Sequence, residues 1–111
     1  MGRDKREKGI ELEKTFKFFG RKTCDVCFKA KGKIEYFIKR WNVGAPLVYY
    51  DVDQPEGMAE GAWYDVADIP TIVLEEGESI LGRWKEKPPR LHELFGLFGI
   101  NDPRALAVEE A

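Results

Sequence analysis

The sequence is poor in the residues on which several classes of small protein depend. Its 111 residues include only two cysteines and one histidine. This excludes a disulfide-rich scaffold and argues against a single-chain zinc site, which needs about four ligands. No segment approaches the roughly 20 consecutive apolar residues of a membrane helix. The formal net charge is only −2, with both signs mixed along the chain, so we expect neither nucleic acid nor a membrane as partner.

The remaining composition is typical of one compact domain. Hydrophobic residues make up 43% of the chain and charged residues 34%, which is enough to bury a core without disulfides. The stretch MGRDKREKGIELEK at the N-terminus is polar, so we expect no signal peptide and a cytoplasmic protein. We expect residues 1–12 to form a flexible extension, residues 13–100 a single domain and residues 101–111 a tail.

Hydrophobic periodicity predicts seven elements in the order strand, helix, strand, helix, strand, strand, helix. The expected strands are 15–20, 47–52, 71–74 and 79–84; the expected helices are 27–41, 56–64 and one that opens at Pro88. A helical crossover makes the first two strands parallel, and the last two form an antiparallel hairpin.

These elements predict an α/β fold with a mixed four-stranded sheet flanked by helices. The continuous β-prone run of strand 47–52, which shows no clean alternation, suits a central strand that is covered on both faces. Asp53 and Pro55 are expected to provide the cap and the first turn of the helix that follows this strand.

Both cysteines stand in the stretch KTCDVCFKAK, where Cys24 begins the first long helix. Unpaired N–H groups and partial positive charge at a helix N-terminus favour a thiolate and lower the pKa of the leading cysteine. Such a thiolate attacks a disulfide, and Cys27, one turn deeper, is placed to resolve the mixed disulfide. Arg21 and Lys22 add to the positive charge, whereas the carboxylate of Asp25 opposes it.

Two other interpretations of this pair remain open from the residues alone. Cys24 and Cys27 are also compatible with two buried structural thiols, because cysteine is often found in cores. A metal ion or iron–sulfur cluster shared across a dimer would bring four thiolates together. In a reducing compartment, a structural disulfide is the least expected use of the pair.

A second feature is Ile69-Pro70-Thr71, just before the third expected strand. Proline is tolerated at the first position of a strand. If the Ile69–Pro70 bond is cis, it makes a sharp turn that lies against the cysteines and leaves the Ile69 backbone free to pair with an extended substrate. If the bond is trans, Pro70 simply ends a loop.

Taken together, these features resemble the thioredoxin/glutaredoxin superfamily over residues 15–98. The segments that carry the resemblance are, in chain order, FFGRKTCDVC, LVYYDVD and YDVADIPTIVLEEGES. The resemblance implies the thioredoxin fold and an enzyme that exchanges thiols with protein disulfides. It makes Cys24 the attacking thiol, Cys27 the resolving thiol and Pro70 a cis-proline facing them; we expect Thr23, Ile69 and Pro70 to contact substrate.

The same resemblance implies a thiol reductase as redox partner and a role in electron transfer and cell redox homeostasis. We expect a monomer that needs no metal and no cofactor. Two alternatives remain: a glutaredoxin-like enzyme linked to glutathione, and a non-catalytic binding module that uses the same fold.

The sequence departs from the pattern of the superfamily at several places. Thr23 stands where thioredoxins usually have tryptophan, and Asp25-Val26 where they have Gly-Pro. Phe18 and Tyr49 occupy the places of a buried aspartate and its lysine partner, so the usual proton relay is missing. The sequence also lacks the glutaredoxin Cys-Pro-Tyr-Cys motif, and Gly82-Arg83-Trp84 stands where glutaredoxins have the Gly-Gly segment that holds glutathione.

Overall fold

The structure, a computed structural model, describes residues 13–101. The expectations for residues 1–12 and for the tail after Asn101 therefore lie outside the described residues. The elements follow the predicted order: β1 (Lys14–Gly20), α2 (Asp25–Arg40), β2 (Leu47–Asp51), α3 (Pro55–Trp63), β3 (Thr71–Glu76), β4 (Ser79–Lys85) and α4 (Leu91–Phe98).

The four strands form one mixed sheet in the order β2-β1-β3-β4. β1 is parallel to β2 and antiparallel to β3, and β3 pairs with β4 as an antiparallel hairpin. The predicted mixed four-stranded sheet is therefore confirmed. The central position predicted for strand 47–52 is wrong, because among the described strands β2 pairs only with β1 and lies at an edge, where Val48 and Tyr49 are each 37% exposed.

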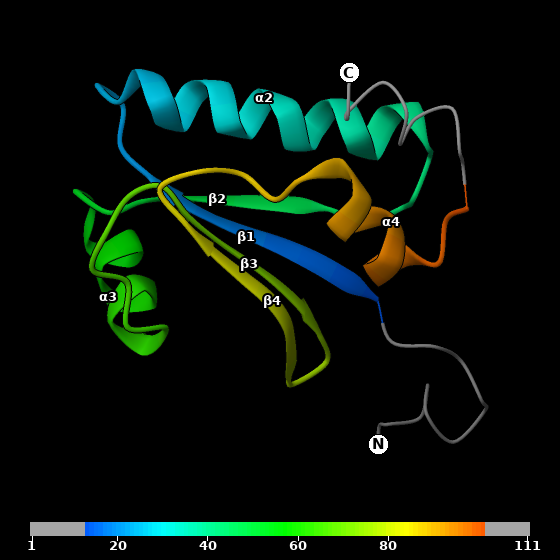
Figure 1. Cartoon of the computed structure of the whole chain (residues 1–111). Helices are drawn as coiled ribbons and strands as arrows, with labels where there is room; N and C mark the ends of the chain where they lie inside the picture. Colours follow the sequence, from blue (N-terminus) through cyan, green and yellow to red (C-terminus); the bar gives the residue numbers. More distant parts are fainter. Residues whose placement is uncertain (1–12, 102–111) are drawn as a thin grey trace.

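β1 divides its side chains between two layers, as strand geometry requires. Phe16 and Phe18 face the layer of α2 and α4 and are fully buried in the main core. Phe19 faces the other layer, where its ring lies 5.7 Å from that of Tyr64 just after α3. Figure 1 shows this arrangement, with α2 and α4 on one face of the sheet and α3 on the other.

α2 is the amphipathic helix that the spacing predicts. Its buried residues recur at steps of three and four, and they are Cys27, Ala30, Ile34 and Phe37. Most residues on the other faces of the helix are exposed, so a single buried stripe fixes the rotation of the helix on the sheet. This rotation buries the second cysteine and leaves the first at the helix end.

α3 and α4 begin differently from the expectation. Gln54 rather than Asp53 is the N-cap of α3, and no side chain caps this helix end, although Pro55 does open the first turn. α4 begins at Leu91 rather than Pro88, because a residue that precedes a proline is pushed towards extended backbone and Pro89 follows Pro88. Among the described residues, no helix combines the length and hydrophobicity that a membrane span needs.

Candidate functional site

The two predicted motifs meet at one end of the sheet. Phe19 near the end of β1 pairs with Thr71 at the start of β3. The start of the loop that runs from β1 to Cys24 therefore lies beside the end of the turn that contains Pro70, as Figure 1 shows. Cys24 and Ile69 both pack against the core cluster.

Cys24 and Cys27 are joined by a disulfide, and their Cα atoms lie 5.2 Å apart. Cys24 is the N-cap of α2, where its Sγ accepts a hydrogen bond from the backbone N–H of Cys27 at 3.0 Å. This N–H is one of the groups that a helix N-terminus leaves unpaired. Cys24 is half-buried and Cys27 only 2% exposed, so the first sulfur is the more accessible of the two.

Gly20, the last residue of β1, lies in close contact with Cys27 of the disulfide. A Cβ at this position would lie 3.2 Å from both Cβ and Sγ of Cys27, and equally close to the ring of Phe18. These distances are shorter than ordinary carbon contacts. The last residue of β1 must therefore be very small for Cys27 to take its place in the core.

A cavity of about 290 Å³ opens beside the disulfide, and it is lined by Arg21, Lys22, Cys24, Cys27, Phe28, Lys31 and Tyr49. Three of these residues carry positive charge and none is acidic. The ammonium group of Lys31 lies 5.8 Å from the ring centroid of Tyr49 and 2.9 Å from the carboxylate of Glu35. Burial and the nearby carboxylate of Asp51 raise the pKa of Tyr49, so its hydroxyl stays protonated at neutral pH.

The two residues that break the expected proton relay are neighbours in the structure. Phe18 and Tyr49 are paired across β1 and β2, and their rings stack with centroids 6.0 Å apart. Phe18 is fully buried beneath Gly20 and Cys27. An aromatic pair therefore fills this place, and within residues 13–101 no carboxylate lines the cavity beside the disulfide.

An ion pair ties the loop that precedes Cys24 to the segment that follows β2. Arg21 donates hydrogen bonds from Nε and Nη2 to the two carboxylate oxygens of Asp53, at 3.0 and 3.1 Å. The Asp53 N–H in turn donates to Asp51 at 2.9 Å. Asp53 thus holds the loop that precedes Cys24 instead of capping α3.

The Ile69–Pro70 peptide bond is cis, as the resemblance implied. The carbonyl of Pro70 accepts a hydrogen bond from the N–H of Glu86 at 2.6 Å, which ties the turn to the end of β4. Within residues 13–101, neither the N–H nor the C=O of Ile69 makes a hydrogen bond. Thr23 is exposed, and none of these three predicted contact residues lines the cavity beside the disulfide.

The segment Gly82-Arg83-Trp84 lies within β4, where it lines a hollow against α4. It does not line the cavity that holds the cysteines. The structure therefore does not bring this segment together with the disulfide to form the site that a glutathione-linked enzyme requires.

Sequence reasoning did not identify Lys31 or the pairing of Arg21 with Asp53. Lys31 could have been found, because it stands four residues after Cys27 and such residues are neighbours on a helix. The pair between Arg21 and Asp53 left no local signal, since 32 residues separate its members and only the parallel alignment of β1 and β2 brings them together.

No family model matches the sequence, and no curated protein matches it. Solved structures of thioredoxins do match. The thioredoxin of Fasciola hepatica has a TM-score of 0.65 and 22% identity, covering 79% of this chain and 83% of that one. The oxidised mitochondrial thioredoxin 3 of Saccharomyces cerevisiae has a TM-score of 0.62 and 21% identity, covering 77% of this chain and 78% of that one.

A third match is thioredoxin-2 of a malaria parasite, with a TM-score of 0.64, 22% identity, and coverage of 79% of this chain and 82% of that one. These likenesses, together with the mixed sheet and its flanking helices, establish that the chain has the thioredoxin fold. The predicted resemblance is thus confirmed at the level of the fold.

Proposed function

We propose that this chain is a thiol–disulfide oxidoreductase that acts on protein disulfides. The observation that carries the proposal is the disulfide between Cys24 and Cys27 at the N-terminus of α2, with the sulfur of Cys24 held by a helix N–H group. A thiolate at that sulfur is stabilised by the same N–H group and by the helix dipole. The greater burial of Cys27 supports its assignment as the resolving thiol.

The proposed reaction proceeds in two exchanges. The thiolate of reduced Cys24 attacks one sulfur of a substrate disulfide, a new S–S bond forms and the other substrate sulfur leaves as a thiolate. The thiolate of Cys27 then attacks the sulfur of Cys24, which closes the intramolecular disulfide and releases the second substrate thiolate. The substrate gains two electrons and the protein loses two; a thiol reductase returns them.

Cys27 must lose its proton before the second exchange, and the described residues that line the cavity beside the disulfide include no carboxylate to take it. The cavity beside the disulfide provides room for water and is bordered by Lys22 and Lys31. We assign the proton to cavity water, with the positive charge of the lysines stabilising the thiolate left behind. In this assignment Tyr49 contributes a neutral hydroxyl and not a base.

The substrate would approach as an extended segment. The unpaired backbone groups of Ile69 support this role, since they are available to pair with such a segment. Thr23 is exposed and directly precedes Cys24, and the carbonyl of Pro70 accepts a hydrogen bond from Glu86. We assign Thr23, Ile69 and Pro70 to substrate contact. We further propose that the protein is a cytoplasmic monomer that acts in redox homeostasis and uses no metal or other cofactor.

A redox-buffer titration of the purified protein tests the proposal directly. Free thiols are counted by alkylation and mass at each potential. A two-electron transition with Cys24 and Cys27 joined in the oxidised form is expected, and about 30 mV in its midpoint corresponds to a tenfold change in equilibrium. Thiols that never pair within one chain would overturn the proposal.

Single cysteine variants separate the two roles. Cys27→Ser is expected to accumulate a mixed disulfide with substrate, because the resolving thiol is gone. Cys24→Ser is expected to abolish attack and with it the reduction of an insulin disulfide. A Cys24→Ser protein that keeps the wild-type reduction rate would show that the roles are wrongly assigned.

A further inference from the structure

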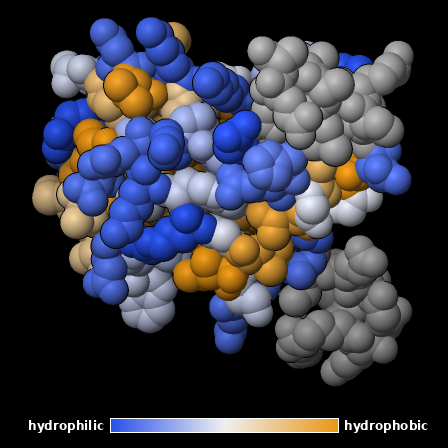
Figure 2. Space-filling view, viewed as in Figure 1, coloured by the Kyte–Doolittle hydropathy of each residue, from blue (hydrophilic) through white to orange (hydrophobic). Residues whose placement is uncertain are grey.

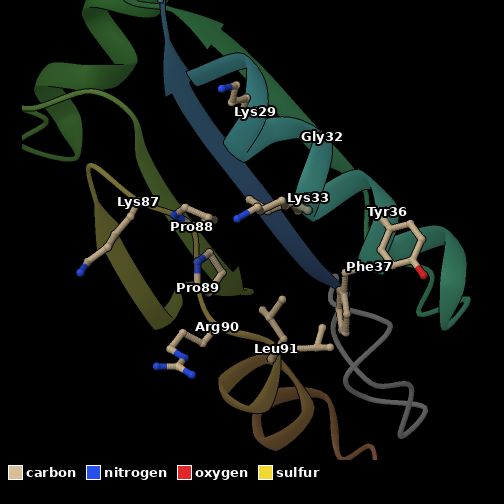
Figure 3. A pocket seen from close by; sticks show the side chains of 12 residues that line it. Lys29, Gly32, Lys33, Tyr36, Phe37, Lys87, Pro88, Pro89, Arg90 and Leu91 are labelled. Atoms are coloured by element: carbon tan, nitrogen blue, oxygen red, sulfur yellow. The ribbon is translucent and has the colours of Figure 1, made fainter. Parts of the chain in front are cut away.

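A larger groove runs along α2 beyond the redox pair. It has a volume of about 800 Å³ and lies between α2 and the segment 87–91 that leads into α4. Figure 3 shows Pro88, Pro89 and Leu91 on one wall, opposite Lys33 and Tyr36. The floor is apolar, because the buried side chains of Ile34, Phe37 and Leu94 form it.

The rim of this groove is basic, and it consists of Lys29, Lys33, Lys87 and Arg90. None of the described residues that line the groove is acidic, although the whole chain has a net charge of −2. Lys29, Lys33 and Lys87 form no ion pair or side-chain hydrogen bond with any residue in the range 13–101. Their charge is therefore not neutralised by neighbours within the described chain.

Gly32 leaves the helix surface bare at the middle of the groove. A glycine inside a helix weakens it relative to alanine, yet a Cβ at Gly32 would meet no atom within 4 Å. Packing within the described residues thus gives no reason for a glycine here. A bare helix surface does allow another backbone to approach closely.

We propose that this groove is a docking site for an acidic amphipathic segment of a partner protein. Apolar side chains of that segment would cover the floor, its carboxylates would pair with Lys29, Lys33 and Lys87, and its backbone would pass over Gly32. A nucleic acid matches the basic rim but not the apolar floor. The groove and the cavity beside the disulfide have no described lining residue in common, so docking does not depend on the chemistry of the redox pair.

The face of the molecule drawn in Figure 2 carries both hydrophilic and apolar side chains. Figure 2 shows that hydrophilic side chains cover most of the face seen there and that apolar ones are confined to patches. An apolar floor framed by lysines therefore selects a ligand that carries both kinds of side chain.

The test uses the full chain and a fluorescent synthetic helical peptide with leucine on one face and glutamate on the other. We expect saturable binding that weakens with added salt. Lys29→Glu/Lys33→Glu should weaken it about tenfold or more, and Gly32→Gln should weaken it several-fold by filling the space over the helix. Lys39→Glu, on the same helix but outside the groove, is the matched control and should bind like the wild type.

Three results would overturn the proposal. They are equal binding of a peptide with glutamine in place of glutamate, equal binding by the Lys29→Glu/Lys33→Glu variant, and binding only to vesicles of anionic lipid. The Cys24→Ala/Cys27→Ala variant should bind the peptide as well as the wild type. Loss of docking and loss of redox activity are therefore measured separately.

Discussion

At the scale of single residues, Gly20 determines how closely β1 approaches the disulfide. An added Cβ would meet Cys27 and the ring of Phe18 at 3.2 Å, and neither can move far within the core. We expect Gly20→Ala to lower the free energy of unfolding by about 1–3 kcal/mol, the usual cost of overpacking. Urea unfolding of the oxidised protein measures this change.

Gly96→Ala is the matched control for that measurement. Gly96 lies in α4, is exposed, and a Cβ there would meet nothing within 4 Å. Alanine at this position should stabilise the helix by up to about 1 kcal/mol. If Gly20→Ala were also neutral or stabilising, the close contact between Gly20 and Cys27 would not limit the site.

Lys31 is the residue through which the cavity is expected to act on the second exchange. Removing its positive charge with Lys31→Met should slow the release of a mixed disulfide from Cys24 about three- to tenfold at pH 7, because less thiolate forms at Cys27. The pH profile of this rate should move to higher pH, and Lys31→Arg should largely restore it. Single-turnover release, followed by mass, gives the rate.

Lys39→Met provides the comparison for Lys31→Met, since Lys39 is on the same helix but does not line the cavity. It should leave the pH profile where it is in the wild type. Equal slowing by both variants would mean that the effect comes from the overall charge of α2 and not from the cavity.

At the scale of secondary-structure elements, α3 depends on a glycine for its contact with the sheet. Gly57 and Gly61 are the buried residues of this helix, and a Cβ on Gly57 would overlap the backbone carbonyl of Asp51 in β2. The helix backbone itself therefore packs on the strand end. Met58 and Trp63 of the same helix are 54% and 81% exposed.

Gly57→Ala should consequently push α3 away from β2. We expect a loss of about 2–3 kcal/mol in the free energy of unfolding, because backbone cannot yield as a side-chain end can. Gly61→Ala, where the added Cβ would lie 3.7 Å from Val66 in ordinary contact, should cost far less. Thermal unfolding of both variants compares them, and equal melting temperatures would refute the proposed contact.

Some features of the helices and strands could be predicted from the sequence alone, and others could not. The spacing of apolar residues predicted α2 and its buried face, because burial along one stripe leaves a period of three to four residues. The position of β2 at the edge was not predictable in this way, since Val48 and Tyr49 favour strands whether or not a neighbour covers them. The cap of α3 was missed because Asp53 pairs with Arg21 in the folded chain, whereas the later start of α4 follows from a local signal, the proline at Pro89.

Part of the candidate site could likewise be predicted from the sequence, and part of it could not. Cys24, Cys27 and Pro70 belong to short motifs that can be read directly from the chain. The cavity beside the disulfide joins residues from β2, α2 and the loop between β1 and α2, so it exists only once β1 and β2 are aligned. Contacts between distant segments, such as the one between Arg21 and Asp53, therefore needed the structure.

At the scale of the whole molecule, a charged cluster joins three elements on the face of the sheet opposite the main core. Lys17 in β1 lies 3.2 Å from Glu60 of α3, 3.2 Å from Glu75 of β3 and 2.9 Å from the hydroxyl of Tyr64. Tyr64 also donates a hydrogen bond to Glu75 at 2.5 Å. Burial alone would lower the pKa of Lys17, but its hydrogen bonds to Tyr64, Glu60 and Glu75 outweigh burial and raise it.

This cluster makes the free energy of unfolding fall as the pH rises into the alkaline range. Below about pH 10.4 the lysine is charged in both the folded and the unfolded chain, so the stabilisation is fully present. Above that pH the unfolded chain releases the proton while folded Lys17 keeps it. The free energy of unfolding should then fall with rising pH, through Lys17, by up to about 1.4 kcal/mol per pH unit.

Lys17→Arg isolates this titration from the ion pairs themselves. Arginine keeps the positive charge throughout this range and does not titrate there, so most of the stability at pH 7 should remain while the alkaline slope becomes shallower. Lys17→Met should lose both the stability and the slope. Urea unfolding at several pH values between about 7 and 11.5 measures the pH dependence of the free energy of unfolding. If Lys17→Arg lost stability with rising pH as steeply as the wild type, the alkaline loss would belong to the tyrosines. Tyr64 is one of them, because burial and the hydrogen bond with Glu75 raise its pKa.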